Sequence, residues 1–400
     1  MVRGRDRLYR FPWSRADNAG AWIEVTDECS FSCPGCYRHK LEGHRPLADV
    51  EQDVLDCRRL TNCDGIAIAG GEPLGYPHVL DVVSFISRLG IKPTILSNGA
   101  NLTPELAREL KKAGLAKIHL HVDSAQARPG WEGKDEVSLN DLRQHFADLL
   151  WETGGIQCGF HVTVFRETLS VIPEITAWCR RNVPKVQHIS FIAFRTLPLD
   201  AGLAYYAGGR LVKIEDLLDE RTKDLDISIT AEDMAGRITE RWPDFGTAAF
   251  LNGTVSVGTR KYLIGVQVGS RHGVYGVLGP KSIELVQTAY HLVKGRYLSF
   301  LRHSAVGKKI FVLALVDRSL RQALKTFLRS AIREPRHLVA KIYTQSIHLH
   351  RPSEVLGAQS DFCDGCLNMM AWRGRLIPSC RLDDYRVYGT TIVPVSRREV

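Results

Sequence analysis

The chain has 400 residues, of which 44% are hydrophobic and 24% are charged, and its formal net charge is +9. This composition is typical of an ordinary folded protein, and the length predicts one large domain with one or two smaller ones. Residues 1–15 are basic but lack the apolar core of a signal peptide, and no apolar run approaches the roughly 18 residues that span a bilayer. We therefore expect a cytoplasmic protein whose ten cysteines are not paired in disulfides.

Apolar runs alternate with helix-like sequence through residues 21–194. The predicted strands are 21–25, 65–69, 92–96, 117–122, 156–165 and 186–194, and the predicted helices between them are 47–60, 78–89, 139–151, 172–181 and one that begins at Thr103-Pro104. Six such alternations predict a parallel sheet with helices outside, curled into a barrel or partial barrel. In these folds the chemistry lies at the carboxyl ends of the strands.

Three cysteines, Cys29, Cys33 and Cys36, follow the first predicted strand with the spacing CxxxCxxC. Thiolates are soft ligands, and closely spaced cysteines in a reducing compartment predict a metal or iron–sulfur site. Three ligands leave one iron of a four-iron cubane open to a ligand that is not protein. A zinc loop and three unrelated thiols are the alternatives.

A second motif, Gly70-Gly71-Glu72-Pro73, directly follows the predicted strand 65–69. The cysteine triplet and this segment together resemble the radical SAM superfamily. The resemblance implies an α/β fold with a partial (β/α)6 TIM-like barrel, and a [4Fe-4S] cluster whose open iron binds S-adenosylmethionine. It also implies reductive cleavage of this cofactor to a 5′-deoxyadenosyl radical, which abstracts hydrogen from an unactivated C–H bond. The electron donor would be a reductase, a ferredoxin or a flavodoxin.

The resemblance also implies which residues contact S-adenosylmethionine. The candidates for its amino group are Gly70, Gly71, Glu72 and Pro73, because glycine lets the backbone approach and Glu72 offers a carboxylate. The candidates for its carboxylate and ribose stand on or after later strands, at Ser97, Asn98, Asp123, Ser124 and Thr163. Many family members have an aromatic residue before the third cysteine, where this chain has Gly35, and Tyr37 is the candidate replacement. Ordinary capping of strand ends is the alternative role.

Two other features belong to the predicted barrel. His119 and His121 alternate within the strand 117–122, so both point to one face, which could be the lumen. We expect a satisfied polar pair there, with catalysis as the alternative. The loop 128–134 is expected at the active end, as a substrate-contacting segment or as a plain surface loop.

The second half of the chain has a different pattern. Residues 250–277 favour strands, and residues 281–350 are predicted to be largely helical and basic. We expect an N-terminal segment at 1–20, the radical SAM barrel at 21–197, a basic α+β region for substrate or membrane-surface contact at 198–350, and a small cysteine-containing extension at 351–400.

Positive charge is concentrated in residues 251–351, which hold 17 Lys and Arg against 3 acidic residues. This asymmetry favours an anionic partner. Residues 317–333 predict an amphipathic helix with a basic face, which either packs on the core or lies at an anionic lipid surface as a peripheral membrane contact. Nucleic acid is not expected as a partner, because no recognised nucleic-acid module is present.

A second cysteine group, Cys363, Cys366 and Cys380, lies near the C-terminus. A turn at Arg373-Gly374 can return Cys380 towards the CxxC pair. This pattern resembles a reduced form of the SPASM or twitch extension, which holds an auxiliary iron–sulfur cluster in radical SAM enzymes. The fourth ligand would be a distant cysteine, another side chain or substrate. A structural zinc site and incidental cysteines are the alternatives.

The substrate is less defined than the radical chemistry. The basic region favours a lipid or another apolar anionic molecule, and the arrangement is weakly similar to radical SAM enzymes that modify hopanoid or ether lipids. The SPASM-like element favours a peptide or natural-product modifying enzyme instead. A third interpretation is a metal-binding protein without catalysis.

Overall fold

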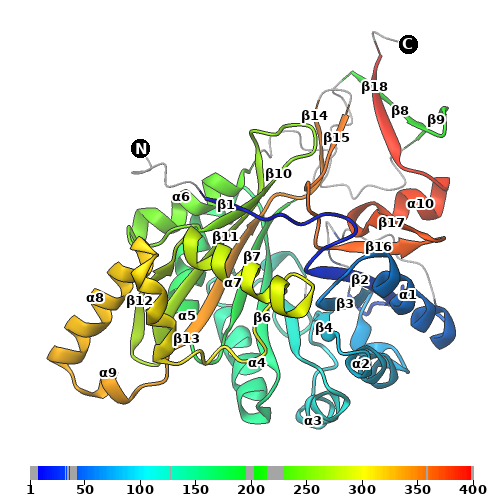
Figure 1. The fold of residues 1–400 in the computed structure, drawn as a ribbon. Helices are drawn as coiled ribbons and strands as arrows, with labels where there is room; N and C mark the ends of the chain where they lie inside the picture. The colour runs from blue at the N-terminus through cyan, green and yellow to red at the C-terminus, as the bar shows by residue number, and fades with distance from the viewer. Residues whose placement is uncertain are drawn as a thin grey trace.

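The structure is a computed structural model that describes residues 8–31, 33, 36, 43–126, 128–194, 202–213, 229–356 and 359–397. Its centre is a curved sheet with six neighbouring parallel strands, β2 (Gly20–Thr26), β3 (Gly65–Gly70), β4 (Lys92–Ser97), β5 (Lys117–His121), β6 (Gln157–Val164) and β7 (His188–Ala193). The helices that alternate with them are α1 (Leu47–Leu60), α2 (Val79–Arg88), α3 (Pro104–Ala113), α4 (Asn140–Thr153) and α5 (Ile172–Arg181) (Figure 1). The predicted α/β fold with a partial TIM-like barrel is confirmed.

The side chains of β3 alternate between the outer face of the sheet, which packs against the helices, and the inner face, which lines the barrel. Ile66 and Ile68 are fully buried in a core that includes Val54 of α1 and Val82 of α2. The inner face of β3 carries only small alanine side chains, which leaves room inside the barrel. Strands that are buried on both faces read as continuous apolar runs, which is the pattern of residues 65–69.

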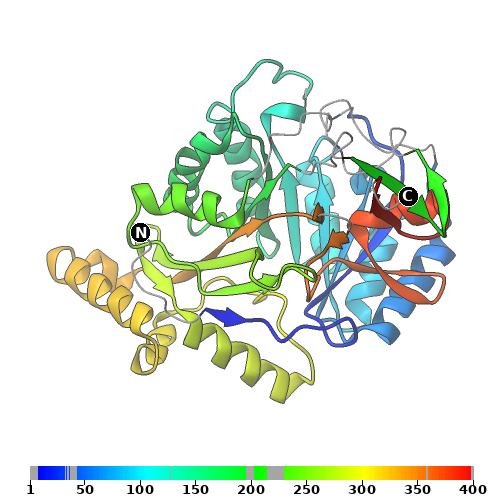
Figure 2. The ribbon, with the colours of Figure 1, turned by 90° about the horizontal axis from the view of Figure 1, so that it is seen from above.

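The sheet continues beyond the six strands at both edges. At one edge β13 (Tyr343–His350) pairs in parallel with β7, and β11 (Arg260–Ser270) pairs antiparallel with β13. At the other edge β16 (Met369–Trp372) pairs in parallel with β2. Seen from above, the yellow-green strands lie across from the helix-covered arc (Figure 2). The prediction that 281–350 is largely helical was therefore wrong for residues 343–350, whose alternating side chains form a strand of the barrel sheet.

The remaining elements surround this sheet. The further strands are β1 (Tyr9–Arg10), β8 (Leu203–Ala207), β9 (Arg210–Val212), β10 (Ala249–Asn252), β12 (Gly273–Leu278), β14 (Glu354–Leu356), β15 (Gln359–Asp361), β17 (Arg375–Pro378) and β18 (Ile392–Ser396). The further helices are α6 (Ala231–Arg241), α7 (Pro280–Lys294), α8 (Arg318–Arg333), α9 (Arg336–Val339) and α10 (Leu382–Tyr388), with short 3-10 turns that include η1 (Pro73–Gly75), η6 (Lys308–Leu315) and η7 (Ser379–Arg381). The boundaries expected between domains stay predictions.

Residues 299–301 close the barrel at the amino ends of its strands. The carbonyl of Phe300 accepts a hydrogen bond from Lys92 Nζ at 2.6 Å, and the carbonyl of Leu301 accepts one from Gln157 Nε2. Ser299 lies directly over the first residue of β3. These contacts join the segment to β3, β4 and β6, so it forms a floor beneath the lumen.

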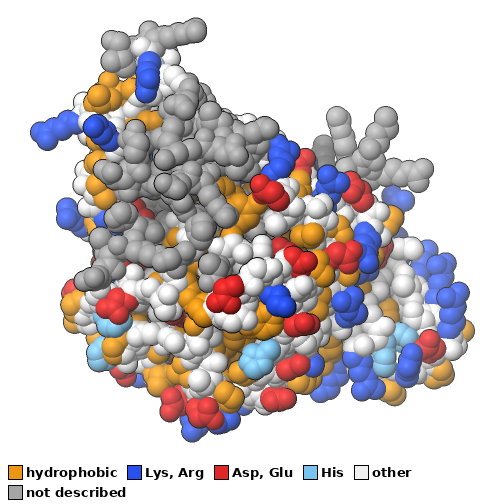
Figure 3. Space-filling view, turned by 180° about the vertical axis from the view of Figure 1, so that it is seen from behind, with side chains coloured by type: hydrophobic (Ala, Val, Ile, Leu, Met, Phe, Trp, Pro, Cys, Tyr) orange, Lys and Arg blue, Asp and Glu red, His pale blue; other side chains and the backbone are white. Residues whose placement is uncertain are grey.

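The predicted basic amphipathic helix is present as α8. Its first turn is capped by Asp317, which accepts a hydrogen bond from the amide of Leu320 at 3.0 Å. Leu320 and Phe327 are buried in a small core, whereas Ile332 is 83% exposed. Figure 3, seen from behind, shows Lys and Arg side chains along the edge of the molecule where α8 lies. No helix in the described ranges has the length and hydropathy needed to cross a membrane, and lipid contact stays a prediction.

Candidate functional site

The cysteine loop leaves the carboxyl end of β2 and packs against the glycine-rich segment. The amide of Gly71 donates to the carbonyl of Thr26 at 2.8 Å, and the amide of Glu72 donates to the carbonyl of Glu28 at 2.7 Å. A Cβ atom on Gly71 would lie 2.1 Å from that second carbonyl, and Gly70 has a φ of +139°. Both positions therefore require glycine, because the two segments approach too closely for a side chain.

The sulfur of Cys29 already receives hydrogen bonds suited to a thiolate ligand. The amide of Phe31 donates to Cys29 Sγ at 3.4 Å, and Asn98 Nδ2 donates to it at 3.7 Å. Cys33 and Cys36 belong to the same loop, in a turn closed by a 3.1 Å hydrogen bond from the amide of Cys36 to the carbonyl of Cys33. Hydrogen bonds to cysteine sulfurs are a normal feature of iron–sulfur sites, so these residues fit a cluster with one open iron.

Glu72 connects the ends of β3 and β4. Its buried carboxylate accepts hydrogen bonds from Ser97 Oγ at 2.6 Å, from the amide of Asn98 at 2.6 Å and from the amide of Leu74 at 3.0 Å. Burial raises the pKa of Glu72 above its ordinary value. A carboxylate has about four acceptor positions, so three are used within the protein. The role of Glu72 towards an ammonium group stays a prediction.

Arg128 forms hydrogen bonds to the same rim. Its guanidinium donates to the carbonyls of Asn98 and His121 at 2.6 and 3.0 Å, and it lies 4.9 Å from the ring centre of Phe31. The sequence placed this residue only within a loop expected to contact substrate. Its long side chain returns to the rim through tertiary packing, and no local pattern indicates that contact.

Asp123 follows β5 and is buried. It contacts His121 Nε2 at 2.6 Å and accepts hydrogen bonds from the amides of Ala125 at 3.0 Å and Thr163 at 3.3 Å. Although burial raises the pKa of Asp123, His121 and these hydrogen bonds hold it below its ordinary value. Ser124 donates its amide to Glu136 Oε1 at 2.5 Å.

The predicted cofactor residues thus gather at one rim. They lie at or just after the carboxyl ends of β2, β3, β4 and β5, and Thr163 lies near the end of β6. The residues at the first four strands are Cys29, the segment from Gly70 to Pro73, Ser97, Asn98, Asp123 and Ser124. Tyr37 lies outside the described residues. The carboxyl ends of parallel strands meet at one edge of a sheet, which explains how motifs far apart in sequence come together.

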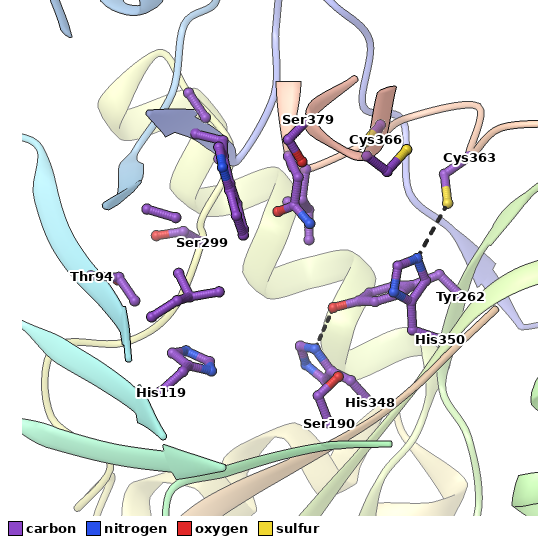
Figure 4. Close-up of a pocket in the computed structure, with 18 of the residues that line it drawn as sticks. Thr94, His119, Ser190, Tyr262, Ser299, His348, His350, Cys363, Cys366 and Ser379 are labelled. Atoms are coloured by element: carbon purple, nitrogen blue, oxygen red, sulfur yellow. Dashed lines mark hydrogen bonds between the residues drawn. The ribbon is translucent and has the colours of Figure 1, made fainter. Parts of the chain in front are cut away.

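Below this rim the lumen contains a cavity of about 210 Å³ (Figure 4). Five histidines line it, His119, His161, His188, His348 and His350, together with Lys117 and the hydroxyls of Thr94, Ser190, Tyr262 and Ser299. No described aspartate or glutamate lines it. Of the histidines the sequence identified only His119 here, although the period-two alternation of the predicted strands 156–165 and 186–194 would also have indicated His161 and His188. His348 and His350 were missed because residues 343–350 were expected to be helical.

These imidazoles are paired with polar neighbours. His119 Nδ1 lies 2.8 Å from His161 Nε2, His188 Nδ1 lies 2.9 Å from Ser346 Oγ, and His348 contacts the hydroxyl of Tyr262. Burial lowers the pKa of His161 to about 3 and that of His350 to about 4. The rings are therefore neutral near pH 7. Nitrogen atoms of His119, His161 and His188 lie within 4.8 Å of one another, but the ammonium of Lys117 close by opposes a cation there.

The C-terminal cysteines line the same cavity. Cys363 and Cys366 follow β15, and Cys380 lies in η7 after the β16–β17 hairpin, whose turn at Arg373-Gly374 is present as predicted. His350 Nε2 lies 3.8 Å from Cys363 Sγ (Figure 4). Burial raises the pKa of Cys366 to about 12, so a metal would have to supply the energy that deprotonates it.

The spacing of these thiols bears on the metal they could hold. Four ligands about 2.3 Å from a tetrahedral zinc ion lie roughly 3.8 Å apart. Within the described ranges the three sulfurs do not all lie within 4.8 Å of one another. These thiols are therefore not arranged in advance for zinc, and the structural zinc site and the auxiliary cluster both stay predictions.

The fold and the rim residues together define a class of protein. It is an α/β barrel in which a three-cysteine loop packs against a glycine-rich segment at the carboxyl ends of the strands. The sequence model of the radical SAM superfamily matches residues 23–148. The part of the chain that holds the cysteine loop and the glycine-rich segment is therefore a radical SAM domain.

The chain is similar to enzymes that are named for different substrates. PqqA peptide cyclase from Streptomyces rochei is 34% identical over 116 residues, which are 28% of this chain and 32% of that protein. GTP 3′,8-cyclase from Pelotomaculum thermopropionicum is 25% identical over 229 residues, which are 54% of this chain and 66% of that protein. The chain spans less than two thirds of each. A crystal structure of Streptococcus suis SuiB bound to precursor peptide SuiA matches 57% of this chain and 46% of that chain, with a TM-score of 0.40 and 16% identity.

Proposed function

We propose that the protein is a radical SAM enzyme that abstracts hydrogen from an unactivated C–H bond of a substrate held in the barrel lumen. Cys29, Cys33 and Cys36 would hold the [4Fe-4S] cluster, and its open iron would face the rim. When bound, the cluster and S-adenosylmethionine supply one electron and a 5′-deoxyadenosyl radical. The protein's own residues bind and orient the cofactor and exclude water from the lumen.

This proposal rests on the contact between the cysteine loop and the ends of β3 and β4. Asn98 donates through Nδ2 to Cys29 Sγ and through its amide to the carboxylate of Glu72. A ligand of the open iron would therefore lie beside Asn98 and the glycine-rich segment. This arrangement supports a chelated cofactor at the rim, directly above the lumen.

The lumen favours a small substrate, or one small group of a larger one. Its volume of about 210 Å³ is below the roughly 300–1,000 Å³ of pockets for drug-sized ligands. The two sequence relatives described above are named for peptide or GTP chemistry and neither for a lipid, so the lipid prediction has no support from them. A peptide substrate is the second candidate, because a relative with 34% identity is named a peptide cyclase. Only the modified side chain of a peptide would enter the lumen.

The C-terminal cysteines extend the proposal to a second cluster. Cys363, Cys366 and Cys380 would hold it in the wall of the lumen, next to the substrate. Asn18, just before β2, donates to the carbonyl of Cys366 at 2.9 Å. The two cysteine groups therefore contact opposite ends of a strand about 20 Å long.

The test is anaerobic reconstitution followed by iron and sulfide analysis, with 5′-deoxyadenosine measured under dithionite. The wild type should bind about eight iron atoms per chain and form the nucleoside. A Cys29/Cys33/Cys36→Ala variant should keep about four and form none. Cys57→Ala is the matched control, because Cys57 is buried in the core, where its thiol contacts the carbonyl of Trp22 and lies far from both cysteine groups in the sequence. Nucleoside formation by the triple variant would overturn the assignment.

A further inference from the structure

Lys117 is a buried lysine whose amine has no carboxylate partner among the described residues. It is the first residue of β5, so the period-two alternation places it on the lumen face with His119. Its side chain is 6% exposed and lines the cavity, and its ammonium lies 3.7 Å from the ring centre of Phe300. The described residues offer it no carboxylate. Burial, with a smaller contribution from Lys92, lowers the pKa of Lys117 to about 7.

The neighbouring Lys92 is a buried lysine with a structural role, and it provides a comparison with Lys117. Lys92 is the first residue of β4 and is equally buried. Its ammonium pairs with Asp64 Oδ2 at 2.7 Å and donates to the carbonyl of Phe300 at 2.6 Å. A buried charge without such a partner is costly. The difference between the two lysines favours a partner for Lys117 from outside the described residues, such as a bound anion.

The surroundings of Lys117 suit an anion. The cavity is lined by neutral imidazoles and by hydroxyls such as that of Thr94, and no described acidic side chain is part of its lining. Lys117 also lies at the floor of the lumen, whereas the cysteine loop and glycine-rich segment lie at the opposite rim. From Lys117 to His121 the strand rises about 13 Å.

We infer that Lys117 binds a phosphate or carboxylate group of the substrate, which is therefore a small anionic molecule anchored at the floor of the lumen. This inference rests on the proposed function, since it takes the lumen to be the substrate site. The anchored group orients the molecule, so that its far end extends about 13 Å towards the rim where the radical forms. Hydroxyls and imidazoles of the wall supply the remaining hydrogen bonds.

The experiment measures anion binding to the reconstituted protein without reductant or S-adenosylmethionine. The melting temperature is followed against inorganic phosphate, pyrophosphate and succinate at constant ionic strength, with chloride as the reference. Protection by the phosphates assigns a phosphate ester, and protection by succinate assigns a carboxylate. Lys117→Met should weaken binding at least tenfold. Lys281→Met is the matched control at an exposed lysine of α7 and should bind like the wild type.

A second readout separates anion binding from a structural role. Lys117→Met should melt at a higher temperature than the wild type when no anion is present, because it removes an unpaired buried charge. Lys117→Gln provides the same comparison if the methionine variant does not fold. Equal protection of wild type and Lys117 variants, or no anion protection of the wild type, would overturn the inference. Absence of nucleoside formation would instead overturn the proposed function and leave the binding result standing.

Discussion

His350 Nε2 lies 3.8 Å from Cys363 Sγ, so the last residue of a barrel strand contacts the C-terminal cysteine group. Cys363 follows β15 and Cys380 follows β17, yet the imidazole that contacts Cys363 comes from β13 in the main sheet. If the three cysteines hold a cluster, its surroundings are therefore shaped by the barrel itself. The first prediction follows from this contact.

His350→Ala should lower the reduction potential of the C-terminal cluster. The imidazole can donate its Nε2–H to a ligated sulfur, and such hydrogen bonds favour the reduced, more negative cluster. The measurement is an anaerobic redox titration followed by electron paramagnetic resonance, in the Cys29/Cys33/Cys36→Ala background so that one cluster remains. His348→Ala is the control, because His348 lines the same cavity but contacts Tyr262. An unchanged potential in His350→Ala would contradict the assigned contact.

Gly71→Ala should disrupt the first cluster site. Its Cβ would lie 2.1 Å from the carbonyl of Glu28, so the cysteine loop must move. We expect a loss of about 1–3 kcal/mol in the free energy of unfolding, and loss of about four iron atoms after reconstitution. Gly236→Ala is the control, since nothing lies within 4 Å of its added Cβ in α6. That change should instead stabilise the protein by about 0.5–1 kcal/mol. Full iron content in Gly71→Ala would show that cluster binding does not require the close approach of Gly71 to the carbonyl of Glu28.

Lys92→Met should destabilise the protein, in contrast to Lys117→Met. The substitution leaves Asp64 buried without its ammonium partner, and breaking a buried pair costs about 3–5 kcal/mol. Chemical denaturation of both variants gives the comparison. The two changes remove the same side chain at neighbouring strand starts, so opposite signs would isolate the effect of Asp64. A destabilisation of the same size in both variants would indicate that lost packing, rather than lost charge, determines the change in the free energy of unfolding.

Asp123 should make stability depend on acid pH. Its folded pKa lies below the unfolded value of about 3.9, so the ionised carboxylate stabilises the fold above that pH. This contribution is lost as the pH falls through the folded pKa. Asp123→Asn should cost about 1–3 kcal/mol at pH 7 and show a shallower loss of stability between pH 5 and 3. Parallel pH profiles for the two proteins would contradict the prediction.

Much of the barrel followed from local patterns. The alternation of apolar runs and helices predicted the six strands, and the Thr103 cap is present, with its hydroxyl accepting from the amide of Leu106 at 3.2 Å. The spacing of Cys29, Cys33 and Cys36 and the Gly70-Gly71 pair indicated the superfamily, because both motifs depend on a few adjacent residues. Strand ends such as Ser97 and Asp123 could be placed at the rim, since parallel strands share one direction.

Non-local pairing could not be inferred in the same way. Residues 343–350 begin 150 positions beyond the end of β7, and only the hydrogen bonds of the assembled sheet make them its neighbour. The inner histidines of β13 were missed for this reason. Arg128 was known only as part of a loop, because its contacts with Asn98, His121 and Phe31 join segments that are distant from one another in the sequence.

The sequence by itself determined the superfamily, the direction of the strands and the residues that could hold a cluster, because ligand spacing and side-chain periodicity are local properties. Only the tertiary structure decided which edges of the sheet β13 and β16 occupy and that Cys363 meets His350. It also decided that, among the described residues, Lys92 has a carboxylate partner and Lys117 has none. These outcomes depend on segments distant in sequence being brought together by burial of apolar surface, and no local pattern records which segments those are.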